Sequence, residues 1–216
     1  MRKNANLLLI CFVLCTWFGA MFTMTLPKIM AQNITEEEML LIDTMQENQS
    51  VSEIDYIKMA LIEEVENYAY GKYAKTHKTI PTSIVEHGLK NEVDIMFIMA
   101  QTQVETSFGT TGAGRETSRR SLFGVINKKY TSYDKAIEDY VQILKKNYLT
   151  KGRTEQHLLK KYTTKGGSRY AEDLSYEVKL SDAYNKIKSS TKIHELQKAY
   201  FIKIEENMLC QNNNGG

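Results

Sequence analysis

The sequence has few residues of the kinds that interrupt or cross-link a chain. It contains two prolines in 216 residues, and its 12 glycines are scattered, which argues against a β-sandwich or a disordered chain. Lys, Glu, Leu and Ile dominate instead, and these residues suit helices. We therefore expect a mainly α-helical protein, with a body of about 150 residues that can bury enough surface to fold without disulfides.

Cysteine and histidine are too few, and too poorly spaced, for a disulfide framework or a metal site. Cys11 and Cys15 both lie in an N-terminal apolar run, and Cys210 stands near the other end of the chain. The four histidines show no metal-ligand spacing. We expect no metal and no cofactor, and we interpret the histidines as surface or packing residues.

The chain also lacks a strong excess of charge of either sign. Its 28 Lys and Arg residues and 26 Asp and Glu residues leave a formal net charge of +2. Removal of residues 1–31 would take away three positive charges and leave −1. This near-neutral balance gives no case for nucleic-acid binding, which relies on basic surfaces.

One long hydrophobic run occurs, at the N-terminus. Arg2 and Lys3 precede an almost wholly apolar segment from Leu7 to Leu26, which is typical of a secretory signal peptide or a signal anchor. About 20 apolar residues suffice to span a bilayer. Cleavage after Ala31 and retention as an anchor are both open. In either case the positive-inside tendency places the rest of the chain outside the cytoplasm, so we expect an exported protein, periplasmic or extracellular, attached to the inner membrane if the segment is kept.

The hydrophobic pattern divides the rest of the chain into three parts. An acidic helix is expected to end at a break over Asn48-Gln49-Ser50, and Ser52 is expected to cap the next helix, which runs towards Tyr73. We interpret the chain as a signal peptide or signal anchor (1–31), an acidic helical linker (32–51), a main domain (52–189), and a C-terminal helix beyond the core with a disordered tail (190–216).

Several shorter helices are expected within the main domain. Pro81 starts one of them, with Thr79 or Thr82 as its cap. A glycine-rich loop is expected at residues 109–114. The further helical segments are expected at residues 134–148, 152–159, 170–180 and 182–187, followed by the C-terminal helix at 192–209.

The most apolar segment of the body runs from Glu92 to Thr106. Apolar residues lie nearly all round it, so this helix should be central. Gln101 and Glu105 are four residues apart and share a face. Burial and the negative end of the helix dipole should both raise the pKa of Glu105. A carboxylic acid that stays protonated near neutral pH can protonate the leaving oxygen in a glycosidase, although a solvated glutamate at a helix end is the simpler interpretation of the spacing alone.

Four strings of the sequence resemble segments of the family 73 glucosaminidases, which include autolysins and the flagellar peptidoglycan hydrolase. The strings are AQTQVETSFG at 100–109, SLFGV at 121–125, YTSYDKAIEDY at 130–140 and SRYAEDL at 168–174, and they follow the family order. Each alone is weak evidence, but four in order are specific. The resemblance covers roughly residues 52–187.

The resemblance implies a lysozyme-like helical fold with a groove for a glycan chain. It implies cleavage of the β-1,4 bond between N-acetylglucosamine and N-acetylmuramic acid in peptidoglycan, with Glu105 as the general acid. Tyr170 matches a tyrosine near the cleft, and Phe108 and Phe123 match aromatic residues that either stack on sugar or pack under the groove. The expected substrate-binding residues are Gln101, Phe108, Phe123, Tyr130 and Tyr170.

The chain departs from the family pattern between the second and third strings. Only residues 126–129 separate them, where family members carry a longer segment that forms a small β-lobe, so we expect a reduced β-lobe. A second acidic residue has no secure match. Glu116 is the best candidate, and the alternative is a solvated charge paired with Arg115, Arg119 or Arg120. Whether a second carboxylate or the acetamido group of the substrate assists the reaction therefore stays open.

Three functions are compatible with these sequence features. The first is a peptidoglycan glucosaminidase, whose partners are glycan strands of the cell wall. The second is a lytic transglycosylase, which shares the fold and the single acid but usually has a G-L-M-Q-like string that is absent here. The third is a catalytically inactive wall-binding or assembly protein. The oligomeric state is open.

Overall fold

The computed structural model of the chain describes residues 36–124 and 128–213, with side chains over 53–124 and 128–211. The apolar N-terminal segment lies outside these ranges. Within them no helix is long and apolar enough to span a membrane. The chain forms two compact units, residues 1–51 and 52–216, and every side-chain contact described below lies in the second.

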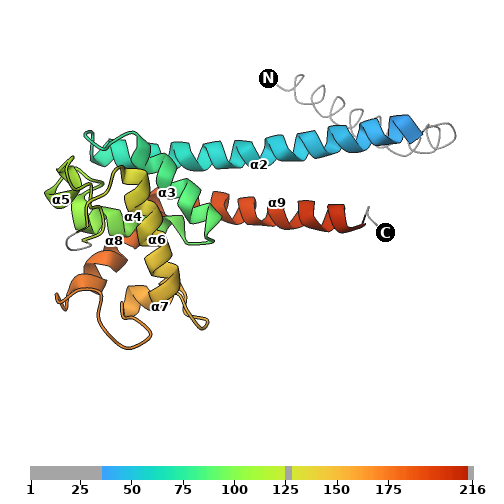
Figure 1. Ribbon diagram of the computed structural model, residues 1–216. Helices are drawn as coiled ribbons and strands as arrows, with labels where there is room; N and C mark the ends of the chain where they lie inside the picture. Colours follow the sequence, from blue (N-terminus) through green and yellow to red (C-terminus); the bar gives the residue numbers. More distant parts are fainter. Residues whose placement is uncertain (1–35, 125–127, 214–216) are drawn as a thin grey trace, which may run out of the picture. The chain divides into compact units, whose positions relative to one another are not determined.

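The described residues are mainly helical, as expected, and contain no strand; their one isolated β-bridge pairs Thr163 with Arg169. The expected β-lobe is therefore without a strand in the described ranges. The helices in chain order are α2 (Glu36–Lys72), α3 (Thr79–Lys90), α4 (Ile95–Thr106), α5 (Gly112–Arg115), α6 (Tyr133–Ile143), the π-helical η1 (Leu144–Tyr148), α7 (Glu155–Lys160), α8 (Tyr176–Ser190) and α9 (Ile193–Asn213) (Figure 1).

Helix α2 is continuous where a break was expected. It runs through Asn48, Gln49 and Ser50, so Ser52 lies inside the helix rather than at its start. These residues lower helix propensity only slightly, and neither Gly nor Pro interrupts the segment. The backbone hydrogen-bond ladder can therefore extend across it, and the sequence-based prediction of two separate helices is wrong.

Helices α3 and α5 also differ from the expectation at their N-termini. The N-cap of α3 is Lys78, and no side chain caps it. Thr79 is already inside the helix, and its hydroxyl contacts His77 Nδ1 at 2.9 Å. The segment expected to be a glycine-rich loop contains the short helix α5, because its glycines do not prevent a single helical turn.

The C-terminal part of the chain forms longer helices than expected. Helix α8 is one helix rather than two pieces, and it begins at Tyr176 because Asp173 Oδ1 accepts hydrogen bonds from the Ser175 N–H and hydroxyl, at 2.8 and 2.7 Å, just before it. Helix α9 starts inside the core, where Ile193 is fully buried, so it does not lie wholly beyond the core. It extends to Asn213, into the segment expected to be a disordered tail; residues 214–216 are outside the described ranges.

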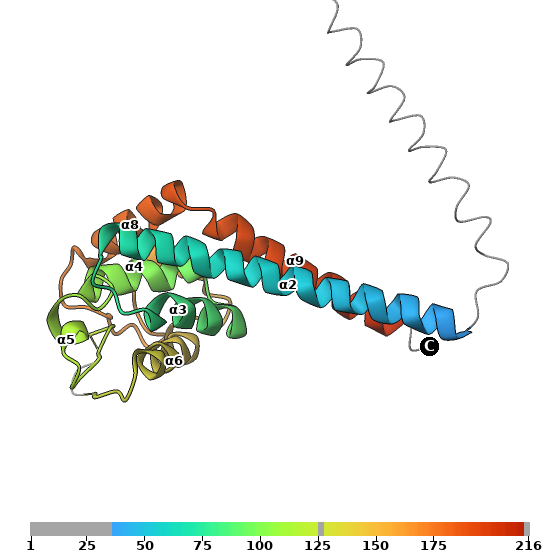
Figure 2. The same ribbon diagram turned by 90° about the horizontal axis from the view of Figure 1, so that it is seen from above.

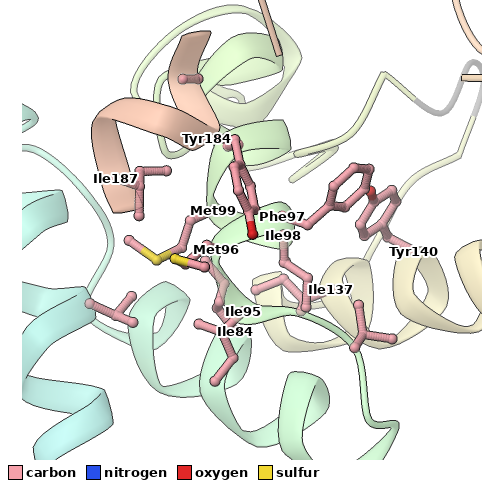
Figure 3. Close-up of a cluster of buried hydrophobic side chains, with 14 of the residues drawn as sticks. Ile84, Ile95, Met96, Phe97, Ile98, Met99, Ile137, Tyr140, Tyr184 and Ile187 are labelled. Carbon is pink, nitrogen blue, oxygen red and sulfur yellow. The ribbon is translucent and has the colours of Figure 1, made fainter. Parts of the chain in front are cut away.

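Helix α4 is the central helix, as its apolar composition predicts. It packs against α3, α5, α8 and α9, and residues 95–100 are all fully buried. Figure 3 shows its side chains meeting those of Ile84 from α3, Ile137 and Tyr140 from α6, and Tyr184 and Ile187 from α8. Burial of this many apolar side chains is the main stabilising contribution to the fold, and it fixes α4 in place.

Both ends of α4 are anchored by specific hydrogen bonds. At the N-terminus, Asp94 is the N-cap and accepts from the Met96 N–H at 2.9 Å, and Gln197 of α9 accepts from the Ile95 N–H at 3.0 Å. These bonds satisfy backbone donors that an isolated helix would leave unpaired. At the C-terminus, Ser107 adopts a left-handed conformation with φ of 49°, and its N–H returns to Gln103 O at 3.0 Å.

The part of α2 from Ser52 onward lies alongside α9 (Figure 2). Lys203 Nζ pairs with Glu53 Oε2 at 2.8 Å, and the Lys192 N–H donates to Glu64 Oε2 at 3.1 Å. Leu61, a fully buried residue of α2, belongs to the same core as α4. The second unit therefore holds α4, and the glutamate near its end, in a rigid helical frame.

Candidate active site

Glu105 is the next-to-last residue of α4, and its side chain is half-buried. One carboxylate oxygen, Oε1, accepts a hydrogen bond from the Tyr176 hydroxyl at 2.5 Å. The other oxygen, Oε2, faces Gly124, where an added Cβ would lie 2.8 Å from it. Gly124 is exposed and has a φ of +62°, a conformation that favours glycine. The carboxyl group therefore has one oxygen held in the interior and one that lies at an exposed backbone turn.

The pKa of Glu105 is raised above the ordinary value of a glutamate. Burial of the carboxylate is the main cause, because desolvation disfavours the charged form. The hydrogen bond from the Tyr176 hydroxyl pulls the pKa in the opposite direction. The net direction agrees with the sequence-based expectation. Glu105 thus keeps its proton to a higher pH than a solvated glutamate does.

A chain of buried hydrogen bonds ends at Glu105. Tyr140 donates its hydroxyl hydrogen to Gln101 Oε1 at 3.0 Å, and Gln101 Nε2 donates to the Tyr176 hydroxyl at 2.9 Å. The hydroxyl of Tyr162 lies 3.2 Å from that of Tyr140. Because the Tyr140 hydrogen goes to Gln101, Tyr162 must be the donor in this last pair. Each group in the chain therefore donates towards the carboxylate.

Stacked aromatic rings hold the segment that faces Glu105. The ring of Phe123 stacks on that of Tyr140 with centroids 3.8 Å apart, and the ring of Tyr170 stacks on that of Tyr162 at 4.4 Å. The hydroxyl of Tyr170 donates to Phe123 O at 2.5 Å. These contacts fix the backbone directly before Gly124, and so they fix the group that lies against Oε2.

Three of the expected substrate-binding side chains are interior residues in the structure. Gln101 and Phe108 are fully buried, and Phe123 is 2% exposed. Phe108 packs between the rings of Tyr68 and Tyr73, with centroids at 6.2 and 5.6 Å. Direct contact of these side chains with a glycan is therefore excluded in this conformation. Gln101 and Phe123 act instead as supports of Glu105 and its surroundings.

Tyr130 and Glu116 do not join the Glu105 hydrogen-bond chain in the part of the chain that the structure describes. The Tyr130 hydroxyl donates to Asp139 Oδ2 at 2.7 Å. Glu116 is exposed and pairs with Arg119 at 3.3 Å, which is the alternative that the sequence left open. Tyr170, by contrast, lies close to Glu105, whose charge contributes to the raised pKa of the Tyr170 hydroxyl.

Sequence reasoning missed several residues that shape this site. Tyr140 and Gly124 stood inside the four strings, so their positions were a usable signal. Tyr176 lies just beyond the fourth string, and Tyr162 lies between the third and the fourth. No local pattern marks these two, because their roles depend on how α8 and the segment before it pack on α4.

Three of the histidines contact polar side chains; His77 pairs with Thr79 as described above. His87 Nε2 lies 2.8 Å from Asp134 Oδ1, and His157 Nδ1 lies 3.0 Å from the Thr154 hydroxyl at the start of α7. Over residues 53–124 and 128–211, no group of three or more His, Cys, Asp or Glu residues is placed to hold a metal ion.

Two other carboxyl groups in the described part of the chain also have a raised pKa, and both have structural roles. The pKa of Asp94 and that of Glu155 are raised mainly by burial. Asp94 caps α4 and accepts from the Tyr184 hydroxyl at 2.7 Å, while Glu155 Oε1 accepts from the Asp94 N–H at 3.1 Å. Both oxygens of Asp94 therefore have a hydrogen-bond donor within the fold, Oδ1 from the Met96 N–H and Oδ2 from the Tyr184 hydroxyl.

Replacement of Glu155 should stabilise the chain at neutral pH. The folded chain holds the Glu155 proton more tightly than the unfolded chain, so ionisation of this carboxyl lowers the free energy of unfolding as pH rises through its folded pKa. Glu155→Gln keeps an oxygen for the Asp94 N–H and loses no proton. We expect a higher free energy of unfolding than wild type at pH 7, with a difference that shrinks as pH falls towards the pKa of a free glutamate, in urea titrations.

Glu138 provides a matched control, because its ionisation has the opposite effect on the free energy of unfolding. Glu138 is partly exposed, and its pKa is lowered by its hydrogen bond and ion pair with Lys135. Its contribution to stability is present above its unfolded pKa and is lost as pH falls. Glu138→Gln should therefore leave the free energy of unfolding equal or slightly lower at pH 7. A lower stability of Glu155→Gln than of wild type at pH 7 would contradict the burial argument.

Comparison with protein-family models finds no match for this chain, and comparison with curated proteins finds none either. The functional argument therefore depends on the residues themselves and on their arrangement around Glu105.

Proposed function

We propose that this protein is a peptidoglycan hydrolase of the glucosaminidase kind, with Glu105 as its general acid. One observation carries the proposal: residues from four separated strings gather around a single carboxyl group. Glu105 and Gln101 come from the first string, Gly124 from the second, Tyr140 from the third and Tyr170 from the fourth. The strings that resemble the family in sequence are therefore neighbours in space, and the carboxyl at their centre has the raised pKa that a proton donor needs.

The chemistry follows from the state of this carboxyl. Protonated Glu105 donates its proton to the glycosidic oxygen while the bond from that oxygen to the anomeric carbon of N-acetylglucosamine breaks. The N-acetylmuramic acid side leaves with a new hydroxyl. Glu105, now a carboxylate, then accepts a proton from the water that attacks the anomeric carbon, which regenerates the acid and gives a reducing N-acetylglucosamine end.

The group that stabilises the anomeric carbon is proposed to belong to the substrate. In the region that the structure describes, no second carboxylate contributes to the pKa of Glu105 or joins its hydrogen bonds. The carbonyl oxygen of the substrate's 2-acetamido group can attack the anomeric carbon as the leaving oxygen is protonated, and water then opens the ring that results. This route needs one protein carboxyl group, which we propose to be Glu105.

The proposed substrate lies outside the cytoplasmic membrane. The apolar segment from Leu7 to Leu26, preceded by Arg2 and Lys3, supports export as a signal peptide or anchor. We accordingly propose a periplasmic or extracellular site of action, with glycan strands as the partner.

Analysis of digestion products tests the proposed function. Purified peptidoglycan treated with the protein, reduced with borohydride and examined by mass spectrometry should show new reduced N-acetylglucosamine ends. Anhydro-muramic ends would indicate a lytic transglycosylase, which also uses a single acid. Glycan binding in a pull-down without any new ends would indicate a wall-binding or assembly protein and would refute catalysis.

A further inference from the structure

We propose that Tyr176 is a positioning residue that gives the two oxygens of Glu105 different roles: Oε1 is held as a hydrogen-bond acceptor, and Oε2 carries and delivers the proton. The inference deepens the proposed function and depends on it for its catalytic meaning. Tyr176 lies outside the four strings that resemble the family, so the resemblance does not assign it.

The direction of the hydrogen bonds supports this division. The Tyr176 hydroxyl accepts from Gln101 Nε2 at 2.9 Å and can then direct its own hydrogen only towards Glu105 Oε1, at 2.5 Å. Gln101 is oriented in turn, because its Oε1 accepts from Tyr140 at 3.0 Å. An amide that receives a hydrogen at its oxygen and donates from its nitrogen has a single consistent orientation. This series of hydrogen bonds therefore presents a donor, and not an acceptor, to Glu105 Oε1.

A proton on Oε1 would conflict with this arrangement. The Tyr176 hydroxyl would have to become an acceptor from Glu105 while it still accepts from Gln101, and its own hydrogen would lose its partner. Tyr176 is nearly buried, so such an unpaired donor is costly. The proton of Glu105 is therefore retained at Oε2, which faces the exposed backbone of Gly124.

The groups around Glu105 allow the pH dependence of the rate to be assigned to Glu105. Among the residues whose side chains the structure describes, the titratable groups coupled to Glu105 are Tyr140, Tyr162, Tyr170 and Tyr176. The pKa of each tyrosine is raised, mainly by burial. All four stay neutral over the working range, so an alkaline limb in the rate reports Glu105 itself.

The test compares two tyrosines whose hydroxyl groups donate to carboxylates at opposite ends of α4. Tyr176 donates to Glu105, and Tyr184 donates to Asp94 Oδ2 at 2.7 Å, away from the site. Tyr176→Phe removes a donor that favours the carboxylate, so the pKa of Glu105 should rise further. The measurement is the pH profile of kcat/KM on soluble glycan strands. We expect its alkaline limb to move to higher pH. We expect its plateau to fall on the order of 10-fold, since misplacement of a catalytic group slows the reaction. Tyr184→Phe should leave both the limb and the plateau close to wild type.

A merely structural role for Tyr176 predicts something different. Loss of folded protein lowers the plateau without moving the limb, and this result would overturn the proposal. A limb that moves with Tyr170→Phe but not with Tyr176→Phe would also overturn it, because Tyr170 would then be the residue that controls Glu105.

A measurement that needs no activity separates this inference from the proposed function. In NMR spectra of the full-length chain carrying ¹³C-labelled glutamate, the carboxyl resonance of Glu105 should titrate at higher pH in Tyr176→Phe than in wild type. In Tyr184→Phe it should titrate at the same pH as in wild type. If peptidoglycan is not cleaved by wild type but this difference is seen, the proposed function fails while the control of Glu105 by Tyr176 stands.

The unsubstituted chain provides a second test if Tyr176→Phe does not fold. The ¹³Cζ resonance of Tyr176 should follow the titration of Glu105, because its hydroxyl donates to the carboxylate, and that of Tyr184 should not. A Tyr176 resonance that is unaffected while Glu105 titrates would refute the proposal.

Discussion

Glu105→Gln should lower the rate of peptidoglycan cleavage about 100- to 10,000-fold, the range that a positioned general acid supplies. The substitution removes the acidic proton and keeps the shape of the side chain. The amide oxygen can still accept from the Tyr176 hydroxyl, which now contacts Oε1 at 2.5 Å. The loss should therefore be confined to the chemical step, with binding of glycan strands unchanged. Release of reducing ends by the purified variant, measured against wild type, checks the expectation.

The same substitution should make the chain more stable at neutral pH. The pKa of Glu105 is raised by burial in the folded chain, so its ionisation lowers the free energy of unfolding as pH rises through that pKa. A glutamine has no proton to lose. A variant that is less active and more stable is typical of a residue retained for function. As a control, Glu138→Gln changes a partly exposed residue of α6 and should alter neither the rate nor the binding of glycan. Equal clearing of a peptidoglycan gel by wild type and by Glu105→Gln would refute the catalytic assignment.

The sequence predicted those parts of the site that local patterns encode. The apolar run from Glu92 to Thr106 specified a central helix because a helix with no polar face has to be covered on all sides. Because Glu105 is the next-to-last residue of this run, the sequence also placed it near the end of the central helix. The raised pKa of Glu105 was predictable for the same reason: a carboxyl at the end of a buried helix loses solvent.

The parts that failed depend on tertiary contacts. Gln101 shares a face with Glu105, which suggested exposure to substrate, yet Tyr140 and Tyr176 cover it from α6 and α8. A side chain's position on a helix face gives no information about what packs against that face. Tyr176 was missed because the start of α8 was expected earlier, and the turn set by Asp173 has no pattern that separates it from a helix interior.

The continuity of α2 shows the same limit in a simpler form. Asn48 and Ser50 are of types common in turns, but the helix propensities of Asn, Gln and Ser fall short of those of the best formers by less than about 1 kcal/mol per residue. A run of such residues between two strongly helical segments does not outweigh the cooperativity of helix extension. Breaks are predicted reliably from Gly and Pro, and this segment has neither.

Gly124→Ala should lower the cleavage rate about 100-fold while the chain still folds. An added Cβ would lie 2.8 Å from Glu105 Oε2, which is closer than these two atoms can approach, so the carboxyl group would have to move away. A displacement of roughly 1 Å at a catalytic group is enough for a loss of this size. The methyl group would also occupy the side of Oε2 from which the proton is delivered. Rates on soluble glycan strands, with the free energy of unfolding from urea titrations, measure both effects.

The backbone of Gly124 also contributes to stability, and a second glycine separates this effect from the steric one. Gly124 has a φ of +62° and Gly152 a φ of +75°, and a Cβ at Gly152 would meet no atom within 4 Å. A left-handed conformation costs an alanine roughly 1–2 kcal/mol, so both variants should lose stability of this order. Only Gly124→Ala should lose activity beyond its loss of folded protein. If Gly124→Ala cleaves glycan as fast as Gly152→Ala does, then Oε2 is not held against this turn, and the orientation of Glu105 on which its role as proton donor depends is wrong.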